Sequence, residues 1–163
     1  LPLLFHVHLG KFLGEFEAVM AQHPRMVVIL PHLGLSSIKL EQLGSLLDRH
    51  PTLYTDLSFG YDPFVIAGLK RISSNPAMYR EFLHRYPDRV LFGTDIVVTT
   101  HERKTAEWLA GVMRCYRQML ETERYRCGLI EEELNGLALE PALLRQIYEV
   151  NPQRVLGARR WSR

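Results

Sequence analysis

The sequence has little net charge, no long apolar run and only two cysteines. Its 163 residues carry 20 lysines and arginines against 18 aspartates and glutamates, a net charge of +2. This balance gives no electrostatic reason to expect nucleic acid or an anionic membrane as a partner. The longest apolar runs, such as Met26–Pro31, have the length of a strand. They exclude a membrane-spanning helix, which needs about 20 apolar residues.

The scarcity of cysteine limits the covalent cross-links we expect. The two cysteines, Cys115 and Cys127, are too few for a disulfide framework or a cysteine-rich zinc site. Both lie in sequence with helical spacing, so we expect two buried, reduced thiols. Reduced thiols suit the cytoplasm, which is the location we expect.

The two ends of the chain also carry information. The chain begins inside the apolar run Leu1–Phe5, with no basic segment before it. This pattern is typical of a core strand rather than a signal peptide, and we expect the chain to be a piece of something longer. The basic tail at residues 158–163 is short, and we interpret it as a solvated end.

Short apolar runs alternate with amphipathic stretches along the first 95 residues. Apolar runs predict strands over Leu3–His8, Met26–Leu30, Thr52–Leu57 and Arg89–Gly93. Apolar spacing predicts helices over Gly14–Gln22, Lys39–Arg49, Pro63–Ile72, Ala77–Arg85, Glu102–Arg126 and Pro141–Val150, the last ended by Asn151 and Pro152. Continuous apolar strands between helices predict an α/β fold with a parallel sheet.

Each predicted strand ends in polar side chains that are able to bind ligands. These are His6 and His8, His32, Asp56 with Ser58, and Asp95. In parallel α/β folds the carboxyl ends of the strands form the rim of the active site. Histidines and carboxylates on that rim suit divalent metal binding and proton transfer.

Each of these residues also has a structural interpretation when taken alone. The histidine pair could be hydrogen-bonded only, His32 could be a turn residue, Asp56 could cap a turn, and Asp95 could begin a helix. His101, in the loop after the fourth strand, could reach the rim or mark a helix start. The repetition at all four strand ends favours a common site.

The order of these segments resembles the amidohydrolase superfamily, above all its amidohydrolase-2 type metal-dependent hydrolases and related decarboxylases. The resemblance rests on Pro2–His6, Pro31–Gly34, Tyr54–Ser58, Arg89–Asp95 and Asn151–Gly157, and covers nearly the whole chain. It implies a partial TIM (β/α)8 barrel in which the four strands are strands five to eight. Residues 1–157 would be the C-terminal half of that barrel, since a whole one takes about 250 residues.

The resemblance also implies roles for individual residues. His6 and Asp95 would be metal ligands, and Asp95 would also take a proton from water activated by a divalent metal, with zinc expected. His32 would ligate the metal or act on the substrate. His8, Asp56, Ser58 and His101 would support the site or contact substrate.

The family's other two ligands form a His-x-His pair on the first barrel strand. His6 and His8 have that spacing, but Pro31–Gly34 follows after a single βα unit, which favours the fifth-strand assignment. The family pattern is therefore incomplete in this chain.

The resulting functional expectation is hydrolysis of a C–O or C–N bond in a small lactone, ester or amide. One alternative is decarboxylation of an aromatic or unsaturated acid on the same fold. Another is a catalytically incomplete fragment or subunit, completed by an N-terminal half or self-associated through an open sheet edge. A last alternative is an unrelated α/β ligand-binding domain, in which His6, His32 and Asp95 would lie far apart.

Overall fold

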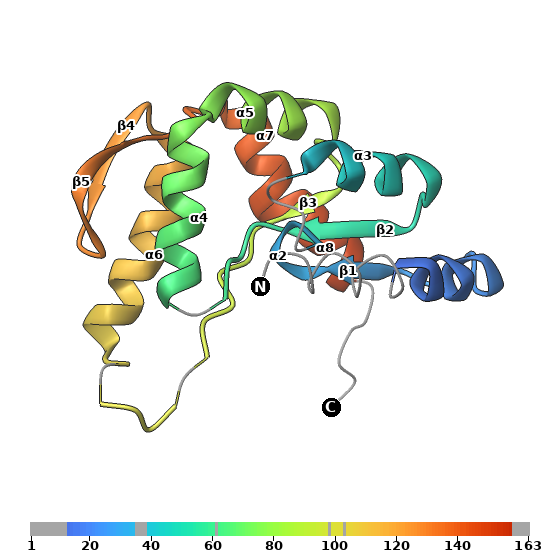
Figure 1. Ribbon diagram of the computed structural model, residues 1–163, viewed down its shortest axis with the longest axis horizontal. Coiled ribbons are helices and arrows are strands. Elements are labelled where there is room, and N and C mark those ends of the chain that lie inside the picture. Colours follow the sequence, from blue (N-terminus) through green and yellow to red (C-terminus); the bar gives the residue numbers. More distant parts are fainter. Residues whose placement is uncertain (1–12, 35–38, 61, 98, 103, 158–163) are drawn as a thin grey trace.

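A parallel three-stranded sheet lies at the centre of the protein, in the order β1-β2-β3 (Figure 1). The computed structural model describes residues 13–34, 39–60, 62–97, 99–102 and 104–157. The strands are β1 (Val28–Leu30), β2 (Leu53–Asp56) and β3 (Val90–Leu91). The parallel α/β prediction is confirmed for these strands, whereas the strand predicted over Leu3–His8 lies outside the described residues. The described sheet does not confirm the partial barrel.

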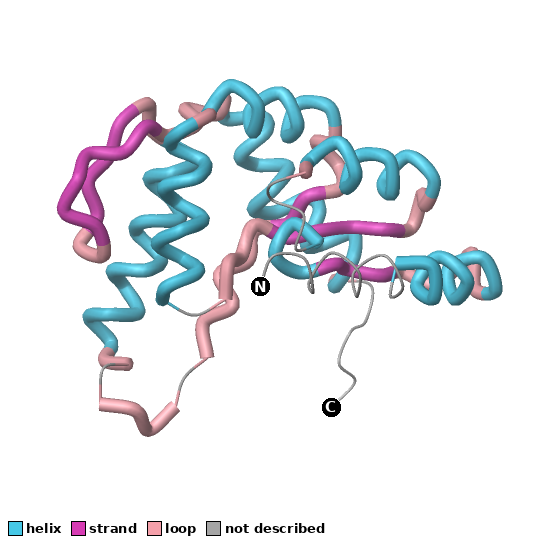
Figure 2. Tube along the Cα trace, in the orientation of Figure 1, coloured by secondary structure: helices cyan, strands magenta, loops and turns pink. Residues whose placement is uncertain are grey.

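Helices connect the strands, as their apolar spacing predicts (Figure 2). They are a helix over residues 13–22, α3 (Leu40–Arg49), α4 (Asp62–Ser74) and α5 (Pro76–Arg85), and β1 is followed by a single turn, α2 (Pro31–Gly34). The leucines of α3 at positions 40, 43, 46 and 47 are all at most 5% exposed. Each such leucine contributes about 1.5–3 kcal/mol by leaving water, so tertiary burial stabilises this short helix.

The long helix predicted over Glu102–Arg126 is wrong at both ends. Helix α6 (Ala106–Glu121) begins after Thr105, whose Oγ1 accepts a hydrogen bond from the Trp108 N–H at 3.1 Å. It is followed by an antiparallel hairpin of β4 (Arg124–Cys127) and β5 (Ile130–Asn135). Residues in β4 alternate between exposed and buried, a period of two that fits a strand and not a helix. The hairpin packs on α4 and α6 (Figure 1).

The expectation of two reduced thiols is also wrong, because Cys115 and Cys127 form a disulfide. Their Cα atoms lie 5.2 Å apart. The early end of α6 lets the chain turn back, which brings β4 against the helix and places Cys127 beside Cys115. The inference of a cytoplasmic location from reduced thiols therefore loses its basis.

The C-terminal helical segment continues past the point where the sequence predicts its end. Helix α7 (Pro141–Arg145) passes through the π-helical turn η1 (Gln146–Val150) into α8 (Asn151–Leu156). Pro152 lies inside this continuous segment, because the backbone directly before it is helical at Val150 and Asn151. The predicted break at Asn151 and Pro152 is therefore wrong.

This C-terminal segment covers the side of β3 that faces away from β2. The N–H of Phe92 donates to Ile147 O at 3.2 Å. The amide of Asn151, a fully buried residue, donates to Val90 O at 2.7 Å and to Pro87 O at 2.9 Å. The β3 edge thus has hydrogen-bond partners within the chain. Among the described helices, none is long and apolar enough to cross a membrane.

Candidate active site

Three polar side chains come together at the carboxyl edge of the sheet. His32 lies in α2, directly after β1, Asp56 is the last residue of β2, and Asp95 follows β3 by four residues. Because the strands are parallel, their carboxyl ends meet at one edge (Figure 1). The structure therefore brings together these residues from three of the four predicted strand ends.

The turn that carries His32 has a left-handed backbone. His32 has φ 61° and ψ 40°, and Leu33 has φ 51° and ψ 38°. This conformation costs roughly 1–2 kcal/mol for each L-residue. Burial of Leu33, which is 1% exposed, and a hydrogen bond from the His32 N–H to Asp56 Oδ1 at 2.8 Å offset that cost. Asp95 also has a positive φ, of 51°. Such backbone conformations cluster at functional sites.

Asp56 organises the centre of the site through one carboxylate oxygen. Its Oδ1 accepts hydrogen bonds from the backbone N–H of His32 at 2.8 Å and from that of Ser58 at 3.0 Å. It also accepts one from the hydroxyl of Ser58 at 2.6 Å. The same hydroxyl oxygen lies 2.8 Å from Nδ1 of His32. Asp56 therefore caps a turn, one of the structural roles considered from sequence, and at the same time connects β2 to His32.

The other ring nitrogen of His32 faces Asp95. Nε2 lies 3.9 Å from Oδ2 of Asp95, with the two side chains 25% and 44% exposed. An imidazole nitrogen and a carboxylate oxygen are typical zinc ligands, with bonds of about 2.0–2.2 Å. A tetrahedral ion would hold two such atoms about 3.4 Å apart, so this pair fits a divalent cation after a movement of about half an ångström. Both groups remain accessible from solvent.

Two residues that the sequence analysis did not single out shape the site. A Cβ added to Gly93 would lie 2.9 Å from Asp56 Oδ2, so the carboxylate occupies space that only glycine leaves. Tyr116, in α6, is fully buried, and its hydroxyl accepts the N–H of Phe59 at 2.9 Å. Burial, and then the carboxylates of Asp56 and Asp95, raise the pKa of Tyr116 well above its usual value. The sequence could have pointed to Gly93, because it lies two residues before Asp95. Tyr116 could not be singled out in this way, because its position has the pattern of an ordinary helix core residue.

Not every predicted site residue can be placed in this cluster. His6 and His8 lie outside the described residues. His101 is exposed in the segment between β3 and α6, which runs away from the sheet (Figure 1), and its N–H donates to Thr99 Oγ1 at 3.3 Å. Within the described ranges, no group of three or more His, Cys, Asp or Glu side chains is able to hold a metal ion. The two candidate donors that the described residues bring together are His32 Nε2 and Asp95 Oδ2.

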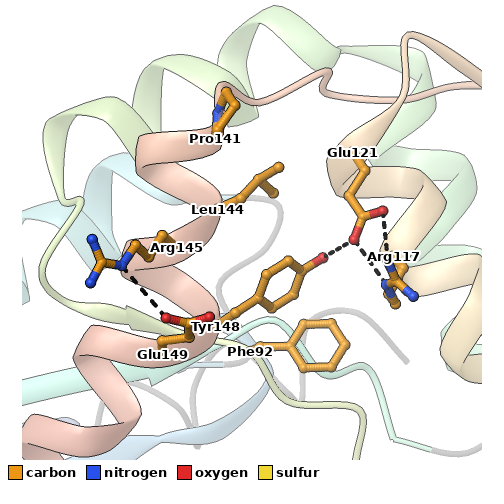
Figure 3. Close-up of a pocket in the computed structure, with 8 residues that line it drawn as sticks. All are labelled: Phe92, Arg117, Glu121, Pro141, Leu144, Arg145, Tyr148 and Glu149. Atoms are coloured by element: carbon orange, nitrogen blue, oxygen red, sulfur yellow. Dashed lines mark hydrogen bonds and ion pairs between the residues drawn. The ribbon is translucent and has the colours of Figure 1, made fainter.

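A separate cavity of about 590 Å³ lies between α6 and the C-terminal helices (Figure 3). The Tyr148 hydroxyl donates to Glu121 Oε1 at 3.0 Å, and Arg117 holds both oxygens of the same carboxylate. On the other wall, Arg145 pairs with Glu149 at 3.5 Å. Burial, followed by the bond to Glu121, raises the pKa of Tyr148. These charges compensate one another, so we assign no ligand to this cavity.

Comparison with known proteins identifies the family. The amidohydrolase family model matches residues 3–158. No curated protein and no solved structure gives a significant match. The matched region spans all the described residues, including the strand ends that carry His32, Asp56 and Asp95. The chain belongs to the amidohydrolase family.

Proposed function

We propose that the protein takes part in metal-dependent hydrolysis of a C–O or C–N bond in a small molecule such as a lactone, ester or amide. The single observation that supports this proposal most is the approach of His32 Nε2 to Asp95 Oδ2 at the carboxyl edge of a parallel sheet. Family membership supports an enzyme of the hydrolase or related class. The side chains of His32 and Asp95 are partly exposed, so a small substrate could approach them from solvent.

In this proposal the two side chains have different tasks. His32 and Asp95 would hold a divalent cation, with zinc as the expected ion and His6 as a further ligand. A bound cation of this kind supplies Lewis acidity and lowers the pKa of water to about 7. The Asp95 carboxylate accepts the proton of the attacking water, while His32 either holds the cation or polarises the reacting group of the substrate. Asp56 and Ser58 keep His32 in place.

A partial barrel would give this proposal a structural frame. If β1, β2 and β3 are strands six to eight of a (β/α)8 barrel, a complementing N-terminal half would supply the His-x-His pair that completes the metal centre. We propose such a half, or a second copy of the chain, as the macromolecular partner. His32 and Asp95 are the candidate donors that lie together among the described residues, and in this proposal the further ligands come from His6 and from the complementing half.

Metal binding is the decisive test. The full chain, stripped with a chelator, is titrated with Zn²⁺ by calorimetry, alone and with a complementing N-terminal half. We expect one ion per chain, and Zn²⁺ binding that is more than about tenfold weaker for His32→Ala and Asp95→Asn. Even the loss of a residue that only hydrogen-bonds a metal ligand typically weakens metal binding about 10–100-fold. His84→Ala and Asp88→Asn are matched controls, since both residues are about half exposed and form ion pairs elsewhere. Absence of stoichiometric binding in both preparations refutes the proposal.

The type of reaction is then determined with the metal-loaded preparation. Hydrolysis of lactone, ester and amide substrates is followed by acid release, and decarboxylation of aromatic acids by CO₂ release. We expect acid release that depends on Asp95. CO₂ release without acid release would favour the decarboxylase alternative.

A further inference from the structure

We infer that Asp56 and Ser58 select the tautomer of His32, so that Nδ1 carries the ring proton and Nε2 presents its lone pair to Asp95. The inference deepens the proposed function and rests on it only for its catalytic meaning. It concerns two positioning residues that act through His32.

Asp56 Oδ1 accepts a hydrogen in each of its three contacts. Oδ1 accepts two backbone N–H groups, from His32 at 2.8 Å and from Ser58 at 3.0 Å. Each of these bonds places a hydrogen against that oxygen, so Oδ1 has no room for a proton of its own. Its third contact, with the Ser58 hydroxyl at 2.6 Å, must therefore use the hydroxyl hydrogen. The length is typical of a charge-assisted O–H···O⁻ bond.

The Ser58 hydroxyl lies between Asp56 Oδ1 and His32 Nδ1. A hydroxyl has one hydrogen and two lone pairs, and the hydrogen of Ser58 is already committed to Asp56. The contact between Ser58 Oγ and His32 Nδ1, at 2.8 Å, is a hydrogen bond only if Nδ1 donates. Ser58 is 1% exposed, so water does not easily provide a substitute partner. The carboxylate thus determines the direction of both bonds.

The other ring nitrogen of His32, Nε2, faces Asp95. In a neutral imidazole with a proton on Nδ1, Nε2 is an acceptor and a metal ligand. Nε2 and Asp95 Oδ2 are 3.9 Å apart, too far for a direct hydrogen bond but close enough to share a cation. Of the two roles considered for His32, the tautomer favours holding the cation over donating a proton to substrate.

The backbone conformation at His32 brings the residue to Asp56 and Ser58. The left-handed turn at His32 places its N–H on Asp56 Oδ1, 24 residues away in the sequence, and its ring Nδ1 on the Ser58 hydroxyl that the same oxygen holds. On the opposite side, Asp56 Oδ2 occupies space that Gly93 leaves open by having no side chain. Asp56 therefore holds both the backbone and the ring of the same residue.

The test is side-chain ¹⁵N NMR of the full chain at neutral pH without metal, which distinguishes a protonated from an unprotonated ring nitrogen. We expect the neutral His32 ring to carry its proton on Nδ1. Ser58→Ala is expected to move the proton to Nε2 in a substantial fraction of molecules and to weaken Zn²⁺ binding about 10–100-fold. Ser58→Thr, which keeps the hydroxyl, is expected to restore both.

Ser45→Ala is the matched control, because the Ser45 hydroxyl donates to the backbone carbonyl oxygen of Glu41 on the exposed face of α3. It should leave the His32 signals unchanged. A wild-type proton on Nε2, or an unchanged tautomer in Ser58→Ala, overturns the inference. The tautomer is read without metal or substrate, so a chain with the expected Nδ1 proton but no zinc binding would refute the proposed function alone.

Discussion

Asn151 offers the sharpest test of how the C-terminal helices hold the sheet. The residue is fully buried, and its amide donates to the carbonyls of Pro87 and Val90 at 2.9 and 2.7 Å. Asn151→Ala leaves both carbonyls without a partner. A buried polar group that loses its partner costs about 1–3 kcal/mol, so the pair predicts a loss of about 2–6 kcal/mol. That is a large part of the 5–15 kcal/mol stability typical of a domain.

Urea unfolding followed by far-UV circular dichroism measures this loss. Asn135→Ala is the matched control, because Asn135 also donates its amide to a backbone carbonyl, that of Ser73, but is exposed. We expect the control to change stability by less than about 0.5 kcal/mol. Asn151→Asp, which keeps the shape but points an acceptor at two carbonyls, should destabilise at least as much as alanine. Wild-type stability in both Asn151 variants would refute the structural role.

Three further predictions concern other parts of the molecule. Reduction of the Cys115–Cys127 disulfide, whose cysteines are 12 residues apart, should lower the free energy of unfolding by about 3 kcal/mol in urea, with a double alanine variant insensitive to reductant. Gly93→Ala should destabilise by about 1–3 kcal/mol and weaken Zn²⁺ binding, because its Cβ would lie 2.9 Å from Asp56 Oδ2; unchanged calorimetry and unfolding would contradict this. Burial raises the pKa of Tyr116 above its usual value of 10. The stability that this tyrosine contributes should therefore be complete below pH 10 and be lost above pH 10, where the hydroxyl ionises in the unfolded chain. If absorbance at 295 nm shows Tyr116 of the native protein ionising near pH 10, this prediction is wrong.

Much of the parallel sheet could be predicted from the sequence because its signals are local. The leucine stripe of α3 and the apolar runs at Val28–Leu30 and Leu53–Asp56 have the helix period and the strand length, and each was predicted to within a few residues. The sequence likewise predicted that His32, Asp56 and Asp95 lie at or just after the ends of strands. A parallel topology then predicts that they meet, because it places all carboxyl ends on one edge.

The errors have a common physical cause. The predicted helix over Glu102–Arg126 followed apolar residues past Thr122, where the chain turns into the hairpin, and so separated two cysteines that the fold brings together. The break predicted at Pro152 treated proline as a helix end, although tertiary contacts of Asn151 keep the helix going. In each case a contact between distant segments overrides the local preference.

By itself the sequence determined the strands of the parallel sheet and the helices between them, and which strand ends carry acids and histidines. The tertiary structure decided what those side chains do to one another. Asp56 reaches His32 across 24 residues through a left-handed turn, and Tyr116 reaches Phe59 across 57. Periodicity does not encode such contacts, because they depend on where folded segments place hydrogen-bond donors and acceptors in space. The orientation of the His32 ring, and with it the chemistry of the site, is therefore a property of the fold.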